Sequence, residues 1–306
     1  GTGTSILSGL DWAIKNRMQV LSMSLGLGYS NPALEKACQK AQEAGCTLVV
    51  ATGNHGAAKI AYPAAYPFCI AVGAVDSALQ LAEFSNYGPE MWVTAPGVNV
   101  YSSVIQGNGR LGKLTANRKK FEVTVLQFSG TTTAAGLKAP VLFAGFGTQD
   151  DFAGRNFTGA VALLELGEKP GEKIRFAKDA GVAAIMIYNN APGILRASLG
   201  QPFPLPVVSL TQDAGKKLAA LAQAGAVEAT LSVLPTDHDY YDGTSMACPH
   251  VSGLCALVLS ANPALTNVQL KEILKNSATD LGDAGWDQKY GWGFINAEKA
   301  LQTAAQ

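Results

Sequence analysis

Histidine is scarce in this sequence, and an excess of charge of either sign is absent. Only 3 of the 306 residues are histidine, and 23 Lys and Arg balance 23 Asp and Glu, so the formal net charge is zero. A chain without excess positive charge has no electrostatic footprint for nucleic acid or for an anionic membrane surface. It also contains no run of about 18 apolar residues, the length that a membrane span needs. We therefore expect neither nucleic acid nor a membrane among its partners.

Cysteine is also sparse, at 5 residues, and no two cysteines have the Cys-x-x-Cys spacing. An odd and scattered set does not indicate a disulfide framework, and the missing spacing argues against a zinc site. We expect mainly buried thiols that pack as small apolar groups. One disulfide, for instance between Cys38 and Cys46 or another thiol on a helix, remains an alternative.

What the sequence does contain favours a large, compact α/β protein. Hydrophobic residues make up 48% and charged residues 15%, with 33 glycines for tight turns. Residues 1–105 alternate helical and strand patterns, with continuous apolar strands at Thr47–Ala51 and Ile70–Val75. Apolar runs of this kind are typical of parallel strands buried on both faces. We predict a parallel sheet with helices on both faces.

The pattern changes in the middle of the chain. Residues 120–235 show short strands around one clear helix, Lys173–Ala180, and a second at Asp213–Gln223. After Tyr240 the first pattern returns, and Met246–Ala261 is apolar on nearly every side, as expected of a helix at the centre of a domain. We therefore predict that a small β-rich domain over 115–236 is inserted into a domain made of 1–110 and 237–306.

The segment Gly243–His250, GTSMACPH, places Ser245 at the start of that apolar helix. The free N–H groups and the dipole at a helix start favour negative charge, which suits a nucleophile whose attack creates an oxyanion nearby. The alternative is an ordinary helix cap, for which Thr244 or Ser245 would serve equally well.

Asn54 lies in a second such segment, ATGNHG, directly after a buried strand. In open α/β sheets, ligand sites lie beyond the carboxyl ends of the strands, and an asparagine there can donate its amide to an oxyanion. The alternative is a turn asparagine.

Together these segments resemble the subtilisin-like (S8) serine proteases. The resemblance extends in family order through LDWAIKNRMQVLSMSLG, YPAAYPFCIAVGAVD, FSNYGPE, APGVNVYSS and YGWGFINAEKAL, and covers residues 1–105 and 239–306. The phrases FTGAVALLELGE and AGVAAIMIYNN make the inserted region similar to a protease-associated (PA) domain. The resemblance implies a subtilisin-like α/β fold, hydrolysis of protein or peptide substrates, and an extracellular location.

The resemblance also implies roles for individual residues. Ser245 is the expected nucleophile, and Asn54 and the Ser245 backbone N–H are the expected oxyanion donors, supported by Thr244. Ala51, Thr52 and Gly53 are expected to form one wall of the primary specificity pocket. No cofactor is required for this chemistry.

Two members of the expected catalytic triad have no counterpart in the sequence. The family's Asp-Gly and His-Gly-Thr-His segments precede Gly1 in family order, and so does a strand that edges the substrate pocket. We expect an upstream segment to supply them, in the same chain or as a separate one, and the isolated chain to be nearly inert. Of the histidines present, we expect His250 to be structural, His55 to shape the specificity pocket, and His238, between Asp237 and Asp239, to lie in a solvated loop.

The resemblance further suggests a weak structural site for calcium or a monovalent cation. Its ligands would be the carbonyls of Ala64, Tyr66 and Cys69 with the carboxylate of Glu90, although Trp92 stands where the family has another carboxylate.

Two alternatives to a protease remain at this point. One is a catalytically incomplete subtilase fragment or pseudoprotease that acts as a protein-binding module. The other is a cysteine enzyme that uses Cys248 and His250.

Overall fold

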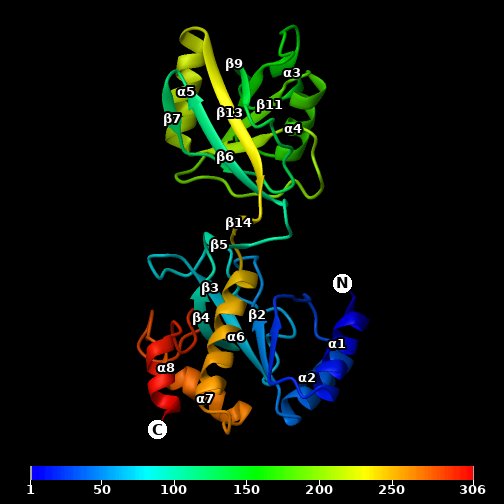
Figure 1. The fold of residues 1–306 in the computed structure, drawn as a ribbon, viewed down its shortest axis with the longest axis vertical. Coiled ribbons are helices and arrows are strands. Elements are labelled where there is room, and N and C mark those ends of the chain that lie inside the picture. The colour runs from blue at the N-terminus through cyan, green and yellow to red at the C-terminus, as the bar shows by residue number, and fades with distance from the viewer. Residues whose placement is uncertain (1, 306) are drawn as a thin grey trace. The chain divides into compact units, whose positions relative to one another are not determined.

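The computed structural model describes residues 2–305 of the chain. They form two compact units, one made of Gly1–Val100 with Tyr240–Gln306 and the other of Tyr101–Asp239 (Figure 1). The inserted unit thus begins before residue 115, the predicted boundary. It does so because strand β6 (Gly109–Ala116) is already paired with strand β13 (Val227–Thr236) of the same unit.

The first unit is built on a parallel sheet of four strands in the order β1-β2-β3-β4. Strands β2 (Thr47–Ala51) and β3 (Cys69–Val75) are buried along their whole length, as their continuous apolar runs predict. Strand β4 (Met91–Pro96) closes one edge. Strand β1 (Val20–Met23) forms the other edge and pairs only with β2 among the described strands.

Helices cover both faces of this sheet, which confirms the predicted fold class. Helices α1 (Gly3–Lys15) and α2 (Pro32–Glu43) pack with one buried cluster of side chains. Helices α6 (Thr244–Ala261), α7 (Asn267–Ser277) and α8 (Ala297–Ala304) share a second cluster on the other face.

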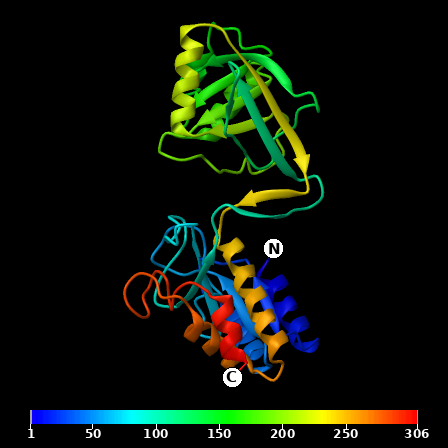
Figure 2. The ribbon, with the colours of Figure 1, turned by 60° about the vertical axis from the view of Figure 1, so that its left-hand side comes forward.

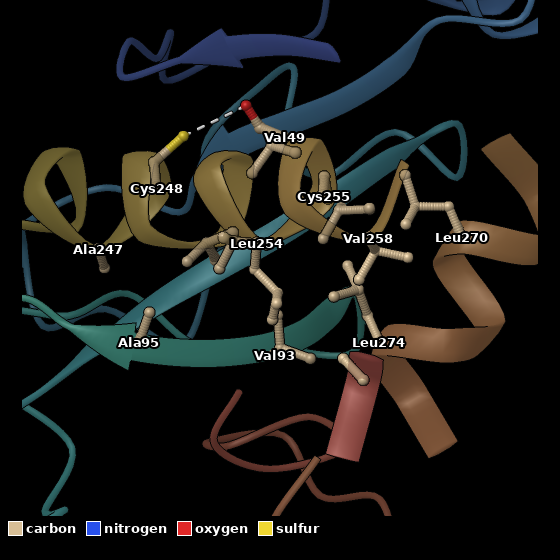
Figure 3. Packing of buried hydrophobic residues seen from close by; sticks show 14 of the residues in the cluster. Val49, Val93, Ala95, Ala247, Cys248, Leu254, Cys255, Val258, Leu270 and Leu274 are labelled. Atoms are coloured by element: carbon tan, nitrogen blue, oxygen red, sulfur yellow. Dashed lines mark hydrogen bonds between the residues drawn. The ribbon is translucent and has the colours of Figure 1, made fainter. Parts of the chain in front are cut away.

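Strand periodicity separates the two clusters. Leu48 and Val50 of β2 belong to the cluster under α1 and α2, whereas Val49 belongs to the cluster under α6. Figure 3 shows this second cluster, with Val93 and Ala95 of β4 beside the buried side of α6. Because successive side chains of a strand point to opposite faces of the sheet, the same strands contribute residues to both clusters.

Helix α6 differs from the prediction that nearly all its sides are buried. Its residues Pro249, His250, Gly253 and Ala256 are exposed, and Leu257 retains 47% of its accessible surface. No element within residues 2–305 covers this face. By length and hydropathy α6 also resembles a membrane span, but half of that window is buried, and core helices pass the same test.

The inserted unit has one sheet of eight strands in the order β7-β6-β13-β9-β10-β11-β12-β8. Helix α5 (Gln212–Ala224) lies against this sheet in both views (Figures 1 and 2). The other elements of the unit are β7 (Lys119–Phe121), β8 (Thr124–Val125), β9 (Leu137–Phe143), α3 (Gln149–Phe152), β10 (Val161–Glu165), α4 (Pro170–Asp179), β11 (Ala184–Tyr188) and β12 (Val207–Leu210).

The longest ladder of this sheet, between β6 and β13, was not predicted. Both strands alternate buried and exposed residues, so neither forms the continuous apolar run that marked the other strands. The two chain segments that flank the insertion pair as β5 (Val100–Ser103) and β14 (His238–Tyr241).

All five cysteines are free and buried, as the sequence predicts. Burial raises the pKa of the Cys255 thiol to about 12 and also raises the pKa of Cys248. Because the reactive species is the thiolate, both effects lower the reactivity of Cys248 and Cys255.

We expect a thiol-specific aromatic disulfide reagent at pH 8 to modify no cysteine of the native protein within minutes, and all five after denaturation. The variant Tyr29→Cys, at a side chain that is 66% exposed, should add one rapidly modified thiol and serves as the positive control. Rapid modification of any native cysteine would contradict the burial described here.

Candidate active site

Ser245 lies in the first turn of α6, whose first residue is Thr244 and whose N-cap is Gly243. The loop before the helix is fixed to the end of β4, because Gly243 donates its N–H to the carbonyl of Gly97 at 2.8 Å. A side chain at position 97 would put its Cβ 2.4 Å from the Cβ of Ala74 and 2.9 Å from the Gly243 carbonyl oxygen. Glycine at this position therefore permits the close approach that sets where the serine lies.

Asn54 follows β2 and is joined to the same helix start. Its Oδ1 accepts hydrogen bonds from the Thr244 backbone N–H at 2.9 Å and from Thr244 Oγ1 at 2.8 Å. Thr244 Oγ1 in turn accepts the N–H of Gly53 at 3.2 Å. Since a backbone N–H can only donate, the atom that faces it must be the amide oxygen, and Nδ2 of Asn54 is the group left to donate elsewhere.

Thr244 is fully buried and holds Asn54 with both its backbone and its side chain. The sequence predicted that Thr244 supports the oxyanion site. In the structure, the two hydrogen bonds from Thr244 orient the Asn54 amide, and Thr244 would support the oxyanion site in this way.

Ser24 is a neighbour of Ser245 that was not among the predicted site residues. Pro249 lies four residues after Ser245 and has no N–H, so the Ser245 carbonyl lacks its usual helical donor. Ser24 Oγ donates to that carbonyl at 2.7 Å. The sequence signal was available, because a proline four residues after a helical residue always leaves a carbonyl that needs another donor.

A cavity of about 500 Å³ opens beside these residues. Of the three residues expected to form its wall, Ala51 and Gly53 line it, whereas the Thr52 side chain is fully buried and is not part of the lining. The segments Ser24–Gly28 and Lys59–Ala61 also line the cavity, and no sequence pattern predicted this.

Asn86 organises the loop that carries Asn54. Although polar, it is 97% buried, with 3% of its surface accessible. Its Oδ1 accepts the N–H groups of His55 at 2.9 Å and Ala57 at 3.2 Å, and its Nδ2 donates to the Thr52 carbonyl at 3.1 Å. One side chain therefore satisfies three backbone groups of a loop that forms no regular structure.

The three histidines differ in their surroundings. His55 is exposed and lines the cavity, as predicted. His250 is exposed, and its Nδ1 lies 2.8 Å from the Met246 carbonyl of the preceding turn. His238 belongs to the inserted unit, where its ring stacks on Tyr101 with centroids 5.4 Å apart. No hydrogen bond joins a histidine to the Ser245 hydroxyl within residues 2–305.

The structure rules out the cysteine enzyme considered above. Cys248 is fully buried in α6, and its Sγ donates to the Val49 carbonyl at 3.2 Å (Figure 3). Burial raises the pKa of this thiol, and His250 is engaged on its own helix. Cys248 is a structural thiol, and the hypothesis of a Cys248–His250 dyad is wrong.

A parallel α/β sheet with a serine at the start of its central helix, and an asparagine amide fixed beside it, defines the class of subtilisin-type serine proteases. The comparisons with known proteins agree with this. A model of the subtilase family matches residues 1–142 and 181–293, and a PA-domain model matches residues 124–218. The chain therefore belongs to the subtilase family and carries a PA domain.

Individual relatives are similar over different shares of the chain. Thermostable alkaline protease from Halalkalibacterium halodurans is 47% identical over 103 residues, which are 34% of this chain and 28% of that protein. M-protease from Shouchella clausii is 27% identical over 302 residues, 99% of this chain and 45% of that protein. This chain thus spans less than half the length of either.

A solved structure shows the same fold. The psychrophilic subtilisin-like protease Apa1 from Pseudoalteromonas sp. AS-11 superimposes with a TM-score of 0.62 at 29% identity, covering 100% of this chain and 76% of that one.

We expect Asn86→Ala to lower the free energy of unfolding by about 3 kcal/mol, because it leaves three backbone groups of the Asn54 loop without a partner. Denaturant unfolding measures the change. Asn108→Ala, which removes an exposed asparagine whose side chain has no hydrogen bond in the described structure, is the matched control and should change stability by less than about 0.5 kcal/mol. Equal effects of the two substitutions would contradict the role given to Asn86.

We expect Thr244→Val to slow the reaction of Ser245 with a fluorophosphonate roughly 10-fold, because Asn54 Oδ1 loses one of its two donors. Thr244→Ser keeps the hydroxyl and should stay within roughly 3-fold of the wild-type rate. The measurement is the inactivation rate with a fluorophosphonate in the protein at its full natural length. If both variants reacted at the wild-type rate, the Thr244 hydroxyl would have no part in positioning Asn54.

Proposed function

We propose that this protein is a serine endopeptidase of the subtilisin type that hydrolyses peptide bonds through an acyl-enzyme on Ser245. The observation that carries the proposal is the fixed Asn54 amide beside the start of α6. Because Thr244 occupies the amide oxygen with two donors, the Nδ2 group is held ready to donate. A residue that only capped the helix would bind the backbone N–H groups of its own first turn. Thr244 instead donates both its backbone N–H and its hydroxyl to Asn54.

In the proposed reaction, Ser245 Oγ attacks the carbonyl carbon of the scissile peptide bond. The negative charge that develops on the carbonyl oxygen is stabilised by the Asn54 Nδ2 amide and by the backbone N–H of Ser245. The hydroxyl proton passes to a general base and then to the leaving amine as the C–N bond breaks. Water then hydrolyses the ester, and the proton that it loses returns to Ser245 by the same base.

The general base and its carboxylate partner are proposed to come from an upstream segment that carries a histidine and an aspartate, in the same chain or as a separate one. Two surfaces of the first unit support this. Strand β1 offers an unpaired edge beside a hollow of about 780 Å³ lined by residues of α1 and β1, and the apolar face of α6 around Leu257 is uncovered. Exposed sheet edges and apolar helix faces favour association with another segment. Without that segment, the chain should be nearly inert.

The proposed substrates are proteins or peptides, with one side chain seated in the cavity next to Ser245. Most of the cavity is apolar, including Leu25, Leu27 and Ile60, while His55 and Lys59 add two basic groups. We also propose an extracellular location, in keeping with the family.

The competing function is a catalytically incomplete subtilase that acts as a protein-binding module. The missing hydrogen bond between Ser245 and a histidine within the described residues favours it. Loss of catalysis would, however, remove the reason for the Asn54 arrangement, which is intact.

Labelling with a fluorophosphonate probe tests the proposal. We expect stoichiometric labelling of the protein at its full natural length, no labelling of Ser245→Ala, and labelling of the isolated 306-residue chain slower by at least roughly 10³-fold. Intact-mass measurement shows the site of the adduct and any associated N-terminal segment.

Asn54→Ala should lower kcat for a peptide substrate by roughly 10²–10³-fold with little change in KM, a range measured for this donor in a subtilisin rather than obtained from this structure. Asn108→Ala is the matched control and should leave both constants unchanged. A folded full-length protein that fails to react with the probe would support the binding module instead of the protease.

A further inference from the structure

Lys271 of α7 is the only residue of that helix that reaches two carbonyls at the start of β3 in the described structure. Its Nζ donates to the carbonyl oxygen of Pro67 at 3.1 Å and to that of Cys69 at 3.1 Å. An ammonium group has three donors and no acceptor, so it can bind several carbonyl oxygens at once, as a metal ion does.

The groups around this ammonium favour a positive charge. Nζ lies 4.0 Å from the centre of the Trp92 ring, whose face attracts cations. Lys271 is half-buried, and burial lowers the pKa of its ammonium, so the group is largely removed from water. Carbonyl oxygens and an aromatic face replace the water that it loses.

One of these two carbonyls, that of Cys69, was expected to bind calcium or a monovalent cation, together with the carbonyls of Ala64 and Tyr66 and the carboxylate of Glu90. The residues do not fit that role. The Cys69 carbonyl already accepts from the Lys271 ammonium at 3.1 Å, and Trp92, which stands where the family has a second carboxylate, places its ring 4.0 Å from the same Nζ. Glu90 is exposed, and a metal ion bound at the Cys69 carbonyl would lie beside the Lys271 ammonium, which repels it.

We propose that the Lys271 ammonium is itself the cation of this site, so that the protein needs no metal ion there. Lys271 connects α7 to the loop before β3 through the Pro67 and Cys69 carbonyls, and Trp92 of β4 covers it. The positive charge that a bound ion would supply from solution is supplied by the chain.

The neighbouring Lys275 provides a matched control. It lies one turn further along α7, its Nζ is 4.3 Å from the centre of the Trp292 ring, and it pairs with Glu272 at 3.5 Å. It shares the charge, the helix and the aromatic contact with Lys271, but no backbone carbonyl accepts from it in the described structure.

The experiment measures thermal unfolding in the background Ser245→Ala, which prevents self-digestion, at the full natural length of the protein. Each variant is compared in choline, sodium and potassium chloride at equal ionic strength, and with calcium chloride or a chelator added.

We expect the Tm of the parent protein to change by less than about 1 °C among these salts. Lys271→Met should lower the Tm in choline by roughly 4–10 °C, because the Pro67 and Cys69 carbonyls lose the ammonium donor, and a small inorganic cation should restore part of the loss. Lys275→Met should show neither effect.

Lys271→Arg keeps the charge and should remain insensitive to the cation. If Lys271→Met does not fold, the parent and Lys271→Arg still test the proposal by their response to salts. The proposal would be overturned, and the metal site supported, if one cation raised the Tm of the parent protein and the substitution Glu90→Gln abolished that increase. A Lys271→Met protein that is as stable as the parent in choline, or that gains nothing from any cation, would overturn it as well.

Discussion

The hydrogen bonds between Asn54 and Thr244 are the constraint on which the site depends. They join two segments that are 190 residues apart, one at the carboxyl end of β2 and the other at the start of α6. Because Thr244 donates twice to one oxygen, the contact fixes both the distance between the segments and the rotation of the amide. The position of Ser245 and the direction of the Asn54 donor are therefore set by one interaction.

The same region explains how the first unit accommodates a large insertion. The chain leaves this unit after Val100 and re-enters it at Tyr240. Three residues inside these two boundaries, Gly243 donates its N–H to the Gly97 carbonyl at 2.8 Å. The two segments of the first unit that lead into and out of the insertion therefore lie close together, beside the end of β4 and the start of α6. An inserted domain whose ends are close together need not distort its host, which is why such insertions are tolerated.

Helix α6 shows how the loss of one helical hydrogen bond is compensated by a side chain from another part of the chain. Pro249 removes the donor that the Ser245 carbonyl would have in a regular helix, and Ser24 supplies it from the segment after β1. The turn that carries Ser245 is thereby attached to the segment after the edge strand β1 as well as to the loop after β2. The Ser24 hydroxyl gives this carbonyl the hydrogen bond that Pro249 cannot provide, which stabilises the turn.

The amino-acid sequence by itself determined the parts of the protein that local patterns encode. The apolar runs of β2 and β3 and the segments around Ser245 and Asn54 carry their own signals, and both strands were predicted within a few residues. Tertiary structure alone decided which side of α6 is covered, how β6 finds β13, and which carbonyls Lys271 reaches. These depend on contacts between side chains and backbone groups far apart in the chain, and such contacts leave no periodic pattern in the sequence.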